Sequence, residues 1–290
     1  MKPVSDLLSL VKFGHSVFAL PFALMGAWLA AGGPPPLRAL LLVVACAVAA
    51  RTAAMGFNRI VDRRLDARNP RTAAREIPAG RVSLRAAWLL VGVSAAAFVA
   101  CAFALNPLAG GLSFPVLAVL LGYSFVKRFS PLAHLALGLA LALAPLGAHV
   151  AVRGEVGQGL APVLWLALAV LTWVAGFDLI YACQDVEFDR RAGLHSIPAR
   201  LGVARALALS SALHVLTVAC LLLVGRAAGL SWFWWVAVLL AAALLVHEHR
   251  IVSPRDLSRV DAAFFTVNGW VALELFAGLA LDRHLLGSGA

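Results

Sequence analysis

The chain has 290 residues, of which 62% are apolar and only 13% carry a charge. Soluble domains are about 45–50% apolar and about 25% charged, so these values exclude a soluble enzyme and predict a multi-spanning membrane protein. The 24 lysines and arginines exceed the 14 acids and give a net charge of +10. In a membrane protein such an excess indicates topology, so we expect no nucleic-acid partner.

Nine apolar runs are each long enough, at about 20 residues, to cross the hydrocarbon core as a helix. In chain order they cover about 15–33, 37–60, 86–106, 108–126, 131–152, 160–181, 204–226, 230–248 and 261–281. None alternates with the period of two that is typical of a membrane β-strand. The sequence therefore predicts an all-α fold, a single membrane domain over residues 1–290 with about nine helices in one bundle around a central cavity.

Nine spans place the two ends of the chain on opposite sides of the membrane. With a cytoplasmic N-terminus, 20 of the 24 cations lie on the cytoplasmic side. The other side then has only Arg38, Arg153, Arg226 and Arg283. This distribution follows the positive-inside rule. We therefore expect a multi-pass protein of a bacterial-type inner (cytoplasmic) membrane, with its C-terminus on the opposite side and with cytoplasmic active-site loops at about 61–85 and 182–203.

A stripe of polar residues marks the end of the second span. Asn58, Asp62 and Asp66 are four residues apart, so on a helix their side chains share one face at about 6 Å spacing. The 29 residues from Arg38 to Asp66 would extend about 43 Å as a helix, beyond the roughly 30 Å hydrocarbon core. The stripe is therefore expected at the membrane surface.

A second stripe ends the sixth span, on the same side of the membrane. Its members, Tyr181, Asp185 and Asp189, are again four residues apart. Mg²⁺ prefers oxygen ligands and typically takes one or two carboxylates together with phosphate oxygens, and arginine can bind phosphate through two hydrogen bonds. The two stripes therefore predict a site for Mg²⁺ and a diphosphate. The candidate diphosphate ligands are Arg71, Arg75, Lys127, Arg128 and Gln184.

An ordinary pair of solvated helix ends is the alternative interpretation of these stripes. A single D-x-x-x-D would favour that alternative, because surface Asp and Arg commonly form ion pairs of little consequence. Two copies at matched ends of two spans, in a chain with only 14 acids, favour a functional site instead.

These motifs resemble those of the UbiA superfamily of intramembrane prenyltransferases. The first family signature, N-x-x-x-D-x-x-x-D followed by R-T, is matched by Asn58, Asp62, Asp66 and Arg71-Thr72. The second, D-x-x-Y-x-x-x-D-x-x-x-D, is matched by Asp178, Tyr181, Asp185 and Asp189. A Tyr-x-x-x-Lys pair matches Tyr123 and Lys127. The resemblance covers nearly the whole chain and implies the nine spans of that family.

The resemblance also implies a reaction, in which a prenyl group moves from an isoprenyl diphosphate to an acceptor within the bilayer. The residues that would hold two Mg²⁺ ions are Asn58, Asp62, Asp66, Asp185 and Asp189. Those that would bind the remaining diphosphate oxygens include Arg71, Arg75 and Lys127. Tyr123 and Tyr181 would contact the diphosphate or face the nascent carbocation. Asp178 would assist the acceptor or its proton loss, although a helix-end aspartate bonded to a neighbouring span is an equal alternative.

The acceptor is suggested by the N-terminal stretch from Lys12 to Phe22, which resembles a bacterial subgroup of the family. Some members of this subgroup act on 4-hydroxybenzoate and others on a naphthoate in the futalosine route to menaquinone. His15 could line the acceptor pocket, with a purely structural role as the alternative. We therefore expect a Mg²⁺-dependent aromatic prenyltransferase of quinone biosynthesis whose partners are a polyprenyl diphosphate, an aromatic acid and the lipid bilayer.

Three other functions share some of these features. A UbiA-type enzyme with a haem, chlorophyll or ether-lipid acceptor would keep the same aspartates and differ in its acceptor pocket. An ion-coupled transporter would place its carboxylates near mid-membrane rather than at helix ends. A CDP-alcohol phosphotransferase would carry D-G-x-x-A-R, whereas Asp62 is followed by Arg63 and Arg64.

Overall fold

The computed structural model describes residues 6, 7, 9, 10 and 19–285. Helices account for the regular structure of these residues, and the one β-type contact among them is an isolated bridge between Ser253 and Asp256. The long helices are α3 (Leu37–Arg68), α4 (Leu84–Leu105), α5 (Pro107–Val126), α6 (Ala133–Arg153), α7 (Leu160–Ala182), α10 (Val203–Ala228), α11 (Trp232–Ile251) and α12 (Asn268–Leu285). The shorter elements are α2 (Leu20–Ala31), η2 (Cys183–Asp185), α8 (Val186–Ala192), α9 (Ile197–Leu201) and η3 (Ala262–Val267).

The predicted all-helical membrane fold is confirmed. Within the described residues, eight helical stretches are long and apolar enough to cross a membrane, and α2 is a shorter apolar helix of 12 residues. The count of nine therefore holds approximately, because the first predicted run, 15–33, begins outside the described residues. The protein is an integral membrane protein.

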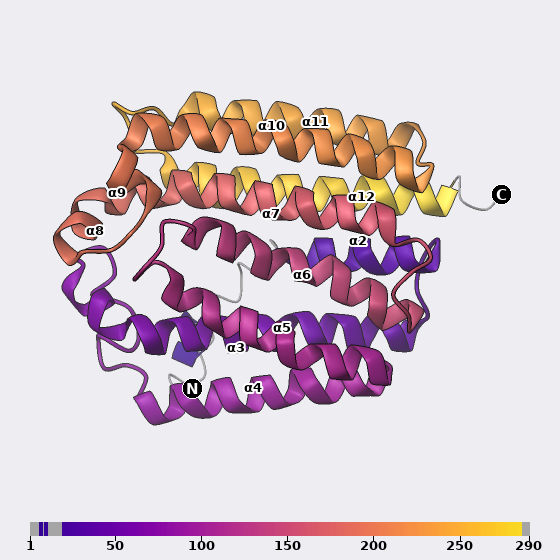
Figure 1. Ribbon diagram of the computed structural model, residues 1–290, viewed down its shortest axis with the longest axis horizontal. Helices are drawn as coiled ribbons and strands as arrows, with labels where there is room; N and C mark the ends of the chain where they lie inside the picture. The colour runs from indigo at the N-terminus through magenta and orange to yellow at the C-terminus, as the bar shows by residue number, and fades with distance from the viewer. Residues whose placement is uncertain (1–5, 8, 11–18, 286–290) are drawn as a thin grey trace.

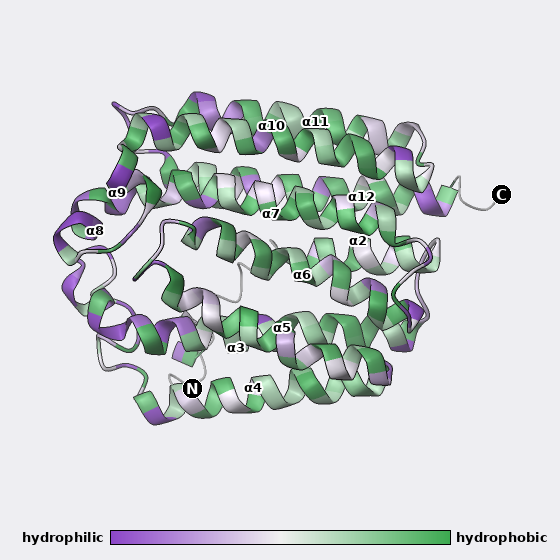
Figure 2. Ribbon diagram, viewed as in Figure 1, coloured by the Kyte–Doolittle hydropathy of each residue, from purple (hydrophilic) through white to green (hydrophobic). Residues whose placement is uncertain are grey.

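The helices lie side by side in one elongated bundle (Figure 1). Helices α10 and α11 form one edge, α3, α4 and α5 form the other, and α7, α6, α12 and α2 lie between them. The short helices α8 and α9 and the link from α3 to α4 all lie at the same end of the bundle. Hydrophilic residues gather at this end, which we call the polar end, while the helix bodies are mostly hydrophobic (Figure 2).

Glycine permits close packing around α7, the most buried of the long helices. A side chain at Gly138 of α6 would collide with the backbone carbonyl of Leu171 in α7. A side chain at Gly26 of α2 would collide with the backbone of Pro145 in α6. Because small residues let helix backbones approach closely in a membrane protein, these positions bring α2, α6 and α7 together and fix the polar side chains that α7 carries.

A buried polar network joins α7, α11 and α12. Asn268 accepts a hydrogen bond of 2.7 Å from Nε1 of Trp173 and donates one of 2.8 Å to Glu248. Asn268 follows the π-helical segment η3, whose residue Phe264 packs against α7. Buried polar groups are costly unless they are bonded, so this network holds η3 in one position beside α7.

The two aspartate segments match the predicted helical stripes to different degrees. The helix α3 continues to Arg68, as the stripe from Asn58 to Asp66 predicts, so the first part of the predicted loop 61–85 is helical. The second stripe does not lie on one continuous α-helix, because α7 ends at Ala182 and the 3₁₀ turn η2 precedes α8. A 3₁₀ turn has about three residues per turn, so it rotates Asp185 and Asp189 away from the face that a straight α-helix would give them.

Candidate active site

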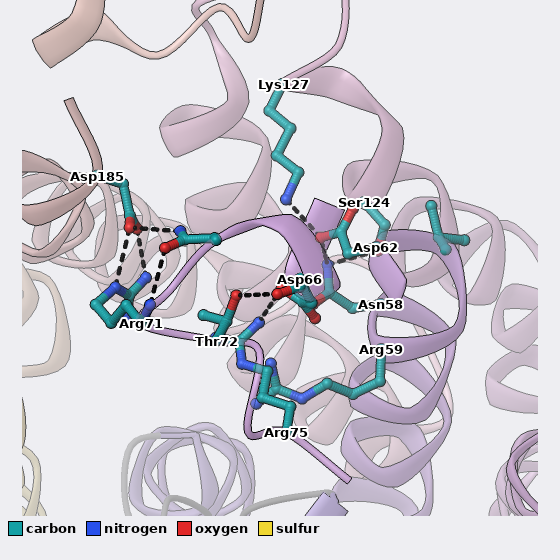
Figure 3. Close-up of polar contacts among 12 residues, drawn as sticks. Asn58, Arg59, Asp62, Asp66, Arg71, Thr72, Arg75, Ser124, Lys127 and Asp185 are labelled. Carbon is teal, nitrogen blue, oxygen red and sulfur yellow. Dashed lines mark hydrogen bonds and ion pairs between the residues drawn. The ribbon is translucent and has the colours of Figure 1, made fainter. Parts of the chain in front are cut away.

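Asp62 is the most buried member of the first stripe, at 2% exposure. Its carboxylate accepts hydrogen bonds from Nζ of Lys127 at 2.5 Å and from a guanidinium nitrogen of Arg128 at 3.0 Å. The side-chain amide of Asn58 donates to it at 3.2 Å (Figure 3). Because a buried carboxylate is unfavourable unless paired, these three donors explain how the charge is kept inside the bundle.

Asp66 lies one turn further along α3 and is also buried, at 6% exposure. One carboxylate oxygen accepts a 2.6 Å bond from Arg75 (Figure 3). The other oxygen, Oδ2, is buried and has no hydrogen-bond partner among the described residues. An unpartnered buried carboxylate oxygen is rare and requires an explanation, and a role in binding a cation is one.

Asp185 is held by the segment that follows α3. Arg71 binds both of its carboxylate oxygens, one of them at 2.9 Å, and donates a 2.7 Å bond to the hydroxyl of Tyr181. The side-chain amide of Asn69 donates to Asp185 at 2.9 Å. Burial works against the charged form of Arg71, but the bonds with Asp185 and Tyr181 outweigh it and raise the pKa of Arg71 above its ordinary value. Arg71 is therefore a permanent cation beside the second aspartate segment.

The two aspartate segments are thus neighbours, as Figure 3 shows for Asp62, Asp66 and Asp185. The half-buried Asp189, on α8, lies within electrostatic range of Asp185 and of Lys127, the partner of Asp62. The backbone amide of His195 also donates to the carbonyl of Lys127 at 2.8 Å. Contacts from α3, α5 and α8 therefore converge at the polar end.

The aspartates do not converge on one point, however. In the part of the chain that the structure describes, no three Asp, Glu, His or Cys side chains form a cluster suited to a metal ion. Asp62, Asp66 and Asp185 are instead each drawn to a basic partner, because carboxylates at this spacing repel one another. Mg²⁺ needs only one or two protein carboxylates when phosphate oxygens complete its shell, so this oxygen-rich donor set and the open Oδ2 of Asp66 fit the expected ion.

Of two further predicted site residues, the structure describes Gln184 but not His15. The side-chain amide of Gln184 donates at 3.5 Å to the carbonyl of Tyr181. It also lines a surface pocket of about 500 Å³ together with Arg71 and Asp185. Gln184 therefore lies beside the charged cluster. The predicted acceptor residue His15 lies outside the described residues.

An apolar cavity of about 280 Å³ runs through the half of the bundle that contains α3, α5 and α6. Its wall on α3 extends from Val43 to Met55, a distance of about 18 Å along the helix. Tyr123, one turn before Lys127, lines the cavity towards the polar end. Arg51 is a cation within this mostly apolar wall. The cavity therefore runs from the bundle interior towards the charged cluster.

Aromatic rings separate the cavity from the second aspartate segment. The ring of Tyr181 lies 4.3 Å from that of Phe264, centroid to centroid, and Phe264 lies 5.1 Å from Phe177. Both phenylalanines line the cavity. The guanidinium of Arg71 lies 5.0 Å from the centre of the Tyr181 ring. Tyr181 therefore contacts the charged cluster on one side and the aromatic wall on the other.

Asp178 lies on α7 one turn before Tyr181, and its side chain is 23% exposed. It forms a 2.7 Å hydrogen bond with Nδ1 of His134, near the start of α6. Asp178 therefore does bond to a neighbouring span, which is the contact that the structural alternative predicts. Tyr123 lies within electrostatic range of Asp178, so this aspartate is near the cavity as well.

Four residues at the site were absent from the sequence prediction: Asn69, Arg51, His134 and Phe264. The cation count assigns Arg51 to the cytoplasmic side, whereas the structure places it within α3, in the cavity wall. It had a signal of its own, because it is an arginine inside an apolar run, and intramembrane cations are functional candidates by default. The others lie outside the spaced motifs, and only the packing of α3, α6 and η3 against α7 brings them to the site.

Comparisons with known proteins identify the family of this arrangement. The model of the UbiA prenyltransferase family matches residues 19–270. A 4-hydroxybenzoate octaprenyltransferase of Aeromonas hydrophila subsp. hydrophila is 35% identical over 258 residues, which is 88% of this chain and 87% of the relative. The enzyme of the same name from Xanthomonas campestris pv. campestris is 37% identical over 262 residues, covering 89% of this chain and 84% of the relative.

Comparisons with solved structures point to the same family. The apo structure of a UbiA homolog from Aeropyrum pernix K1 is 40% identical, with a TM-score of 0.84 over 93% of this chain and 98% of that one. A UbiA homolog from Archaeoglobus fulgidus, bound to DMAPP and Mg²⁺, shares the fold at 22% identity, with a TM-score of 0.69 over 95% of this chain and 99% of that one. The family match covers most of the chain and includes all the aspartates of the candidate site, so this chain belongs to the UbiA prenyltransferase family.

Proposed function

We propose that this protein transfers a polyprenyl group from a polyprenyl diphosphate to an aromatic acid in quinone biosynthesis, with 4-hydroxybenzoate as the acceptor. The names of the relatives from Aeromonas hydrophila and Xanthomonas campestris support this acceptor. Membership of a prenyltransferase family sets aside the transporter and the phosphotransferase.

One observation carries the proposal: the apolar cavity runs to Tyr123, next to the cluster of paired acids and bases. A polyprenyl diphosphate has the same division, with a long apolar chain and a highly charged head. The chain would lie in the cavity and the head at the polar end. Because the cavity is in the bundle interior, the reacting carbon would be held away from water.

The metal site would be formed by the two aspartate segments. Asn58, Asp62, Asp66, Asp185 and Asp189 would hold Mg²⁺, and two ions are expected. When bound, Mg²⁺ supplies positive charge that offsets the negative charge developing on the leaving diphosphate. Oδ2 of Asp66, which has no hydrogen-bond partner among the described residues, would be one of the metal ligands. The Archaeoglobus fulgidus homologue bound to DMAPP and Mg²⁺ has the same fold, which supports the assignment.

The basic residues would bind the diphosphate itself. The structure pairs Arg71, Arg75 and Lys127 with carboxylates, and binding of cations to those carboxylates would leave the three side chains available for phosphate oxygens. Arg128 and Gln184 lie beside them and would add further donors. Pre-arranged cations of this kind stabilise the developing charge without reorganisation during the reaction.

The remaining residues would act on the carbocation and the acceptor. Tyr123 and Tyr181, with the ring of Phe264, present aromatic faces that attract a cation. Arg51, in the cavity wall, would pair with the carboxylate of the aromatic acid. Loss of diphosphate would leave an allylic cation next to the ring of the acceptor, which attacks it and then loses a proton. Asp178, which lies near the cavity and is partly exposed, would receive that proton.

The orientation in the membrane belongs to the same proposal. Hydrophilic residues gather at the polar end in Figure 2, and the positive-inside count of the sequence assigns most cations to the cytoplasmic side. The polar end would therefore face the cytoplasm of a bacterial-type inner membrane, with the C-terminus on the opposite side.

An acceptor screen tests the proposal. Purified protein in detergent or lipid vesicles is given Mg²⁺, octaprenyl diphosphate and one acceptor at a time, and the products are identified by mass spectrometry. We expect prenylated 4-hydroxybenzoate. A product with a dihydroxynaphthoate alone would move the protein to another quinone pathway. A product only with a porphyrin or a glycerol-phosphate acceptor, or with none of these, would refute the aromatic acid as substrate.

A further inference from the structure

We propose that His134 is the positioning residue for Asp178, which would accept the proton that the aromatic ring loses after prenylation. The inference rests on the proposed function and assigns a role to a histidine outside the family motifs. It is carried by two observations: a hydrogen bond between two helices and the different exposure of its two partners.

The hydrogen bond joins α6 to α7 at the polar end. Nδ1 of His134 lies 2.7 Å from Oδ2 of Asp178. An ionised carboxylate can only accept hydrogen bonds, so the ring nitrogen is the donor. Among the described residues, His134 is the only hydrogen-bond partner of the Asp178 carboxylate. This bond therefore selects the rotamer of Asp178.

The two members of the pair differ in exposure. The side chain of Asp178 is 23% exposed, whereas that of His134 is 5% exposed. Asp178 directly follows Phe177, which lines the apolar cavity, and Leu137, one turn after His134, lines it too. Tyr123 of the cavity wall lies within electrostatic range of Asp178. The carboxylate is thus the more exposed member of the pair, next in the chain to a cavity-lining residue.

The second ring nitrogen of His134 adds no polar contact to the pair. Nε2 is buried and has no hydrogen-bond partner among the described residues. The ring nitrogens of His149, on the same helix, lack a partner there as well, so an unpartnered nitrogen does not by itself assign a role. The hydrogen bond with Asp178 is the contact that distinguishes His134 from His149.

The chemistry needs a base at this place. The carbon–oxygen bond of the prenyl diphosphate breaks, and its electron pair leaves with the diphosphate. A ring carbon of the acceptor forms the new carbon–carbon bond with two of its π electrons. The carbon–hydrogen pair at that position then returns to the ring, and the proton goes to the carboxylate of Asp178. Release of the products allows Asp178 to return the proton to water, and the hydrogen bond with His134 again orients the carboxylate.

Two substitutions at His134 separate this role from a structural one. His134→Asn places an amide nitrogen close to the position of Nδ1 and keeps the donor, whereas His134→Leu fills the space and removes it. We expect His134→Leu to lower kcat on the order of 10²-fold, because the carboxylate loses its orientation, and His134→Asn to restore most of the loss. KM for the prenyl diphosphate should change much less than kcat, because the pair forms no hydrogen bond with the bases of the site, although His134 lies within electrostatic range of Asp189.

An isotope effect gives the deciding readout. With 4-hydroxybenzoate deuterated next to its hydroxyl, the wild-type enzyme should show an effect near unity, because removal of the ring proton is normally faster than formation of the cation. His134→Leu and Asp178→Asn should each show an effect well above unity, because proton removal becomes limiting. The double variant should lose no more activity than the worse single variant, since the two residues act as one unit.

The control is His149→Leu. His149 is a second fully buried histidine of α6, about 22 Å further along the helix, and it is not among the cavity-lining residues. It should retain activity and show no isotope effect. His134→Leu with wild-type kcat, or with reduced kcat but an isotope effect near unity, would overturn the inference. If His134→Leu does not fold, the isotope effect of Asp178→Asn is measured instead. A value near unity for Asp178→Asn would also overturn the inference. A wild-type protein that prenylates no aromatic acid would instead refute the proposed function, and this inference with it.

Discussion

Arg71 and Asp185 form a two-point ion pair between segments that are 114 residues apart in the chain. Arg71 follows α3 and Asp185 follows α7, so the pair joins the two aspartate segments directly. The same guanidinium donates to the hydroxyl of Tyr181, at the edge of the aromatic wall. One side chain thus contacts the second aspartate segment and an aromatic residue next to the cavity.

Replacing Arg71 by lysine should therefore impair the enzyme although the charge is kept. An ammonium group cannot bind both oxygens of Asp185 and the hydroxyl of Tyr181 in the fixed geometry of a guanidinium. We expect kcat/KM for the prenyl diphosphate to fall on the order of 10- to 100-fold, the cost of one or two charged hydrogen bonds. The control is Arg64→Lys, at an exposed position of α3. Equal activities of the two variants would argue against a role for this geometry.

Substitution of Asp62 by asparagine tests the first segment. Asp62 pairs with Lys127 and Arg128, and asparagine keeps its size while removing its charge. Turnover should fall on the order of 10³-fold, because the residues that hold the metal and the diphosphate lose their arrangement. Glu187→Gln, on the exposed face of α8, should retain wild-type turnover. Wild-type activity of the Asp62→Asn enzyme would show that the first aspartate segment is not part of the active site.

The length of the prenyl chain should depend on Gly147. This glycine lines the cavity on α6, about 20 Å from His134, and a side chain there meets no atom within 4 Å. Leucine at this position would occupy the cavity far from the polar end. We expect Gly147→Leu to lower kcat/KM for octaprenyl diphosphate on the order of tenfold or more and to leave geranyl diphosphate nearly unaffected.

Gly92→Leu is the matched control for this experiment. Gly92 is exposed on α4, lies outside the cavity lining, and has equal space for a side chain. It should not change the ratio of the two kcat/KM values. A Gly147→Leu enzyme with the wild-type ratio would mean that the chain does not enter this part of the cavity.

The orientation can be measured with cysteines on the two faces. In a background without the four native cysteines, Ala73→Cys marks the exposed link between α3 and α4, and Gly157→Cys marks the exposed link between α6 and α7. A membrane-impermeant thiol reagent added to intact cells should label Gly157→Cys, and should label Ala73→Cys only after the membrane is opened. The reverse pattern would invert the proposed topology.

Much of the fold is predictable from hydrophobic length alone. The predicted run 160–181 corresponds to α7 (Leu160–Ala182), and 108–126 corresponds to α5 (Pro107–Val126). Hydropathy alone does not give the end of α3. The apolar run ends at residue 60, whereas the four-residue spacing predicts a helix as far as Asp66, and α3 continues to Arg68. Asp62 and Asp66 are paired with bases on the part of the helix that extends beyond the apolar run.

The candidate site is only partly predictable, for a related reason. Spacing by four residues identifies Asn58, Asp62 and Asp66 because the pattern is local to one helix. His134 has no local pattern, and its contact with Asp178 exists only because Gly138 allows α6 to approach α7. The separation of the aspartates into ion pairs is likewise set by the basic residues that packing brings to them.

The dependence of prenyl transfer on Mg²⁺ tests the central claim most directly. Purified protein is treated with a chelator, and the release of diphosphate from octaprenyl diphosphate with 4-hydroxybenzoate is measured before and after Mg²⁺ is returned. The account predicts almost no release without the metal and full recovery with it, together with one prenylated acceptor for each diphosphate released. Undiminished release in the chelated protein would contradict a site in which the two aspartate segments hold the diphosphate through metal ions.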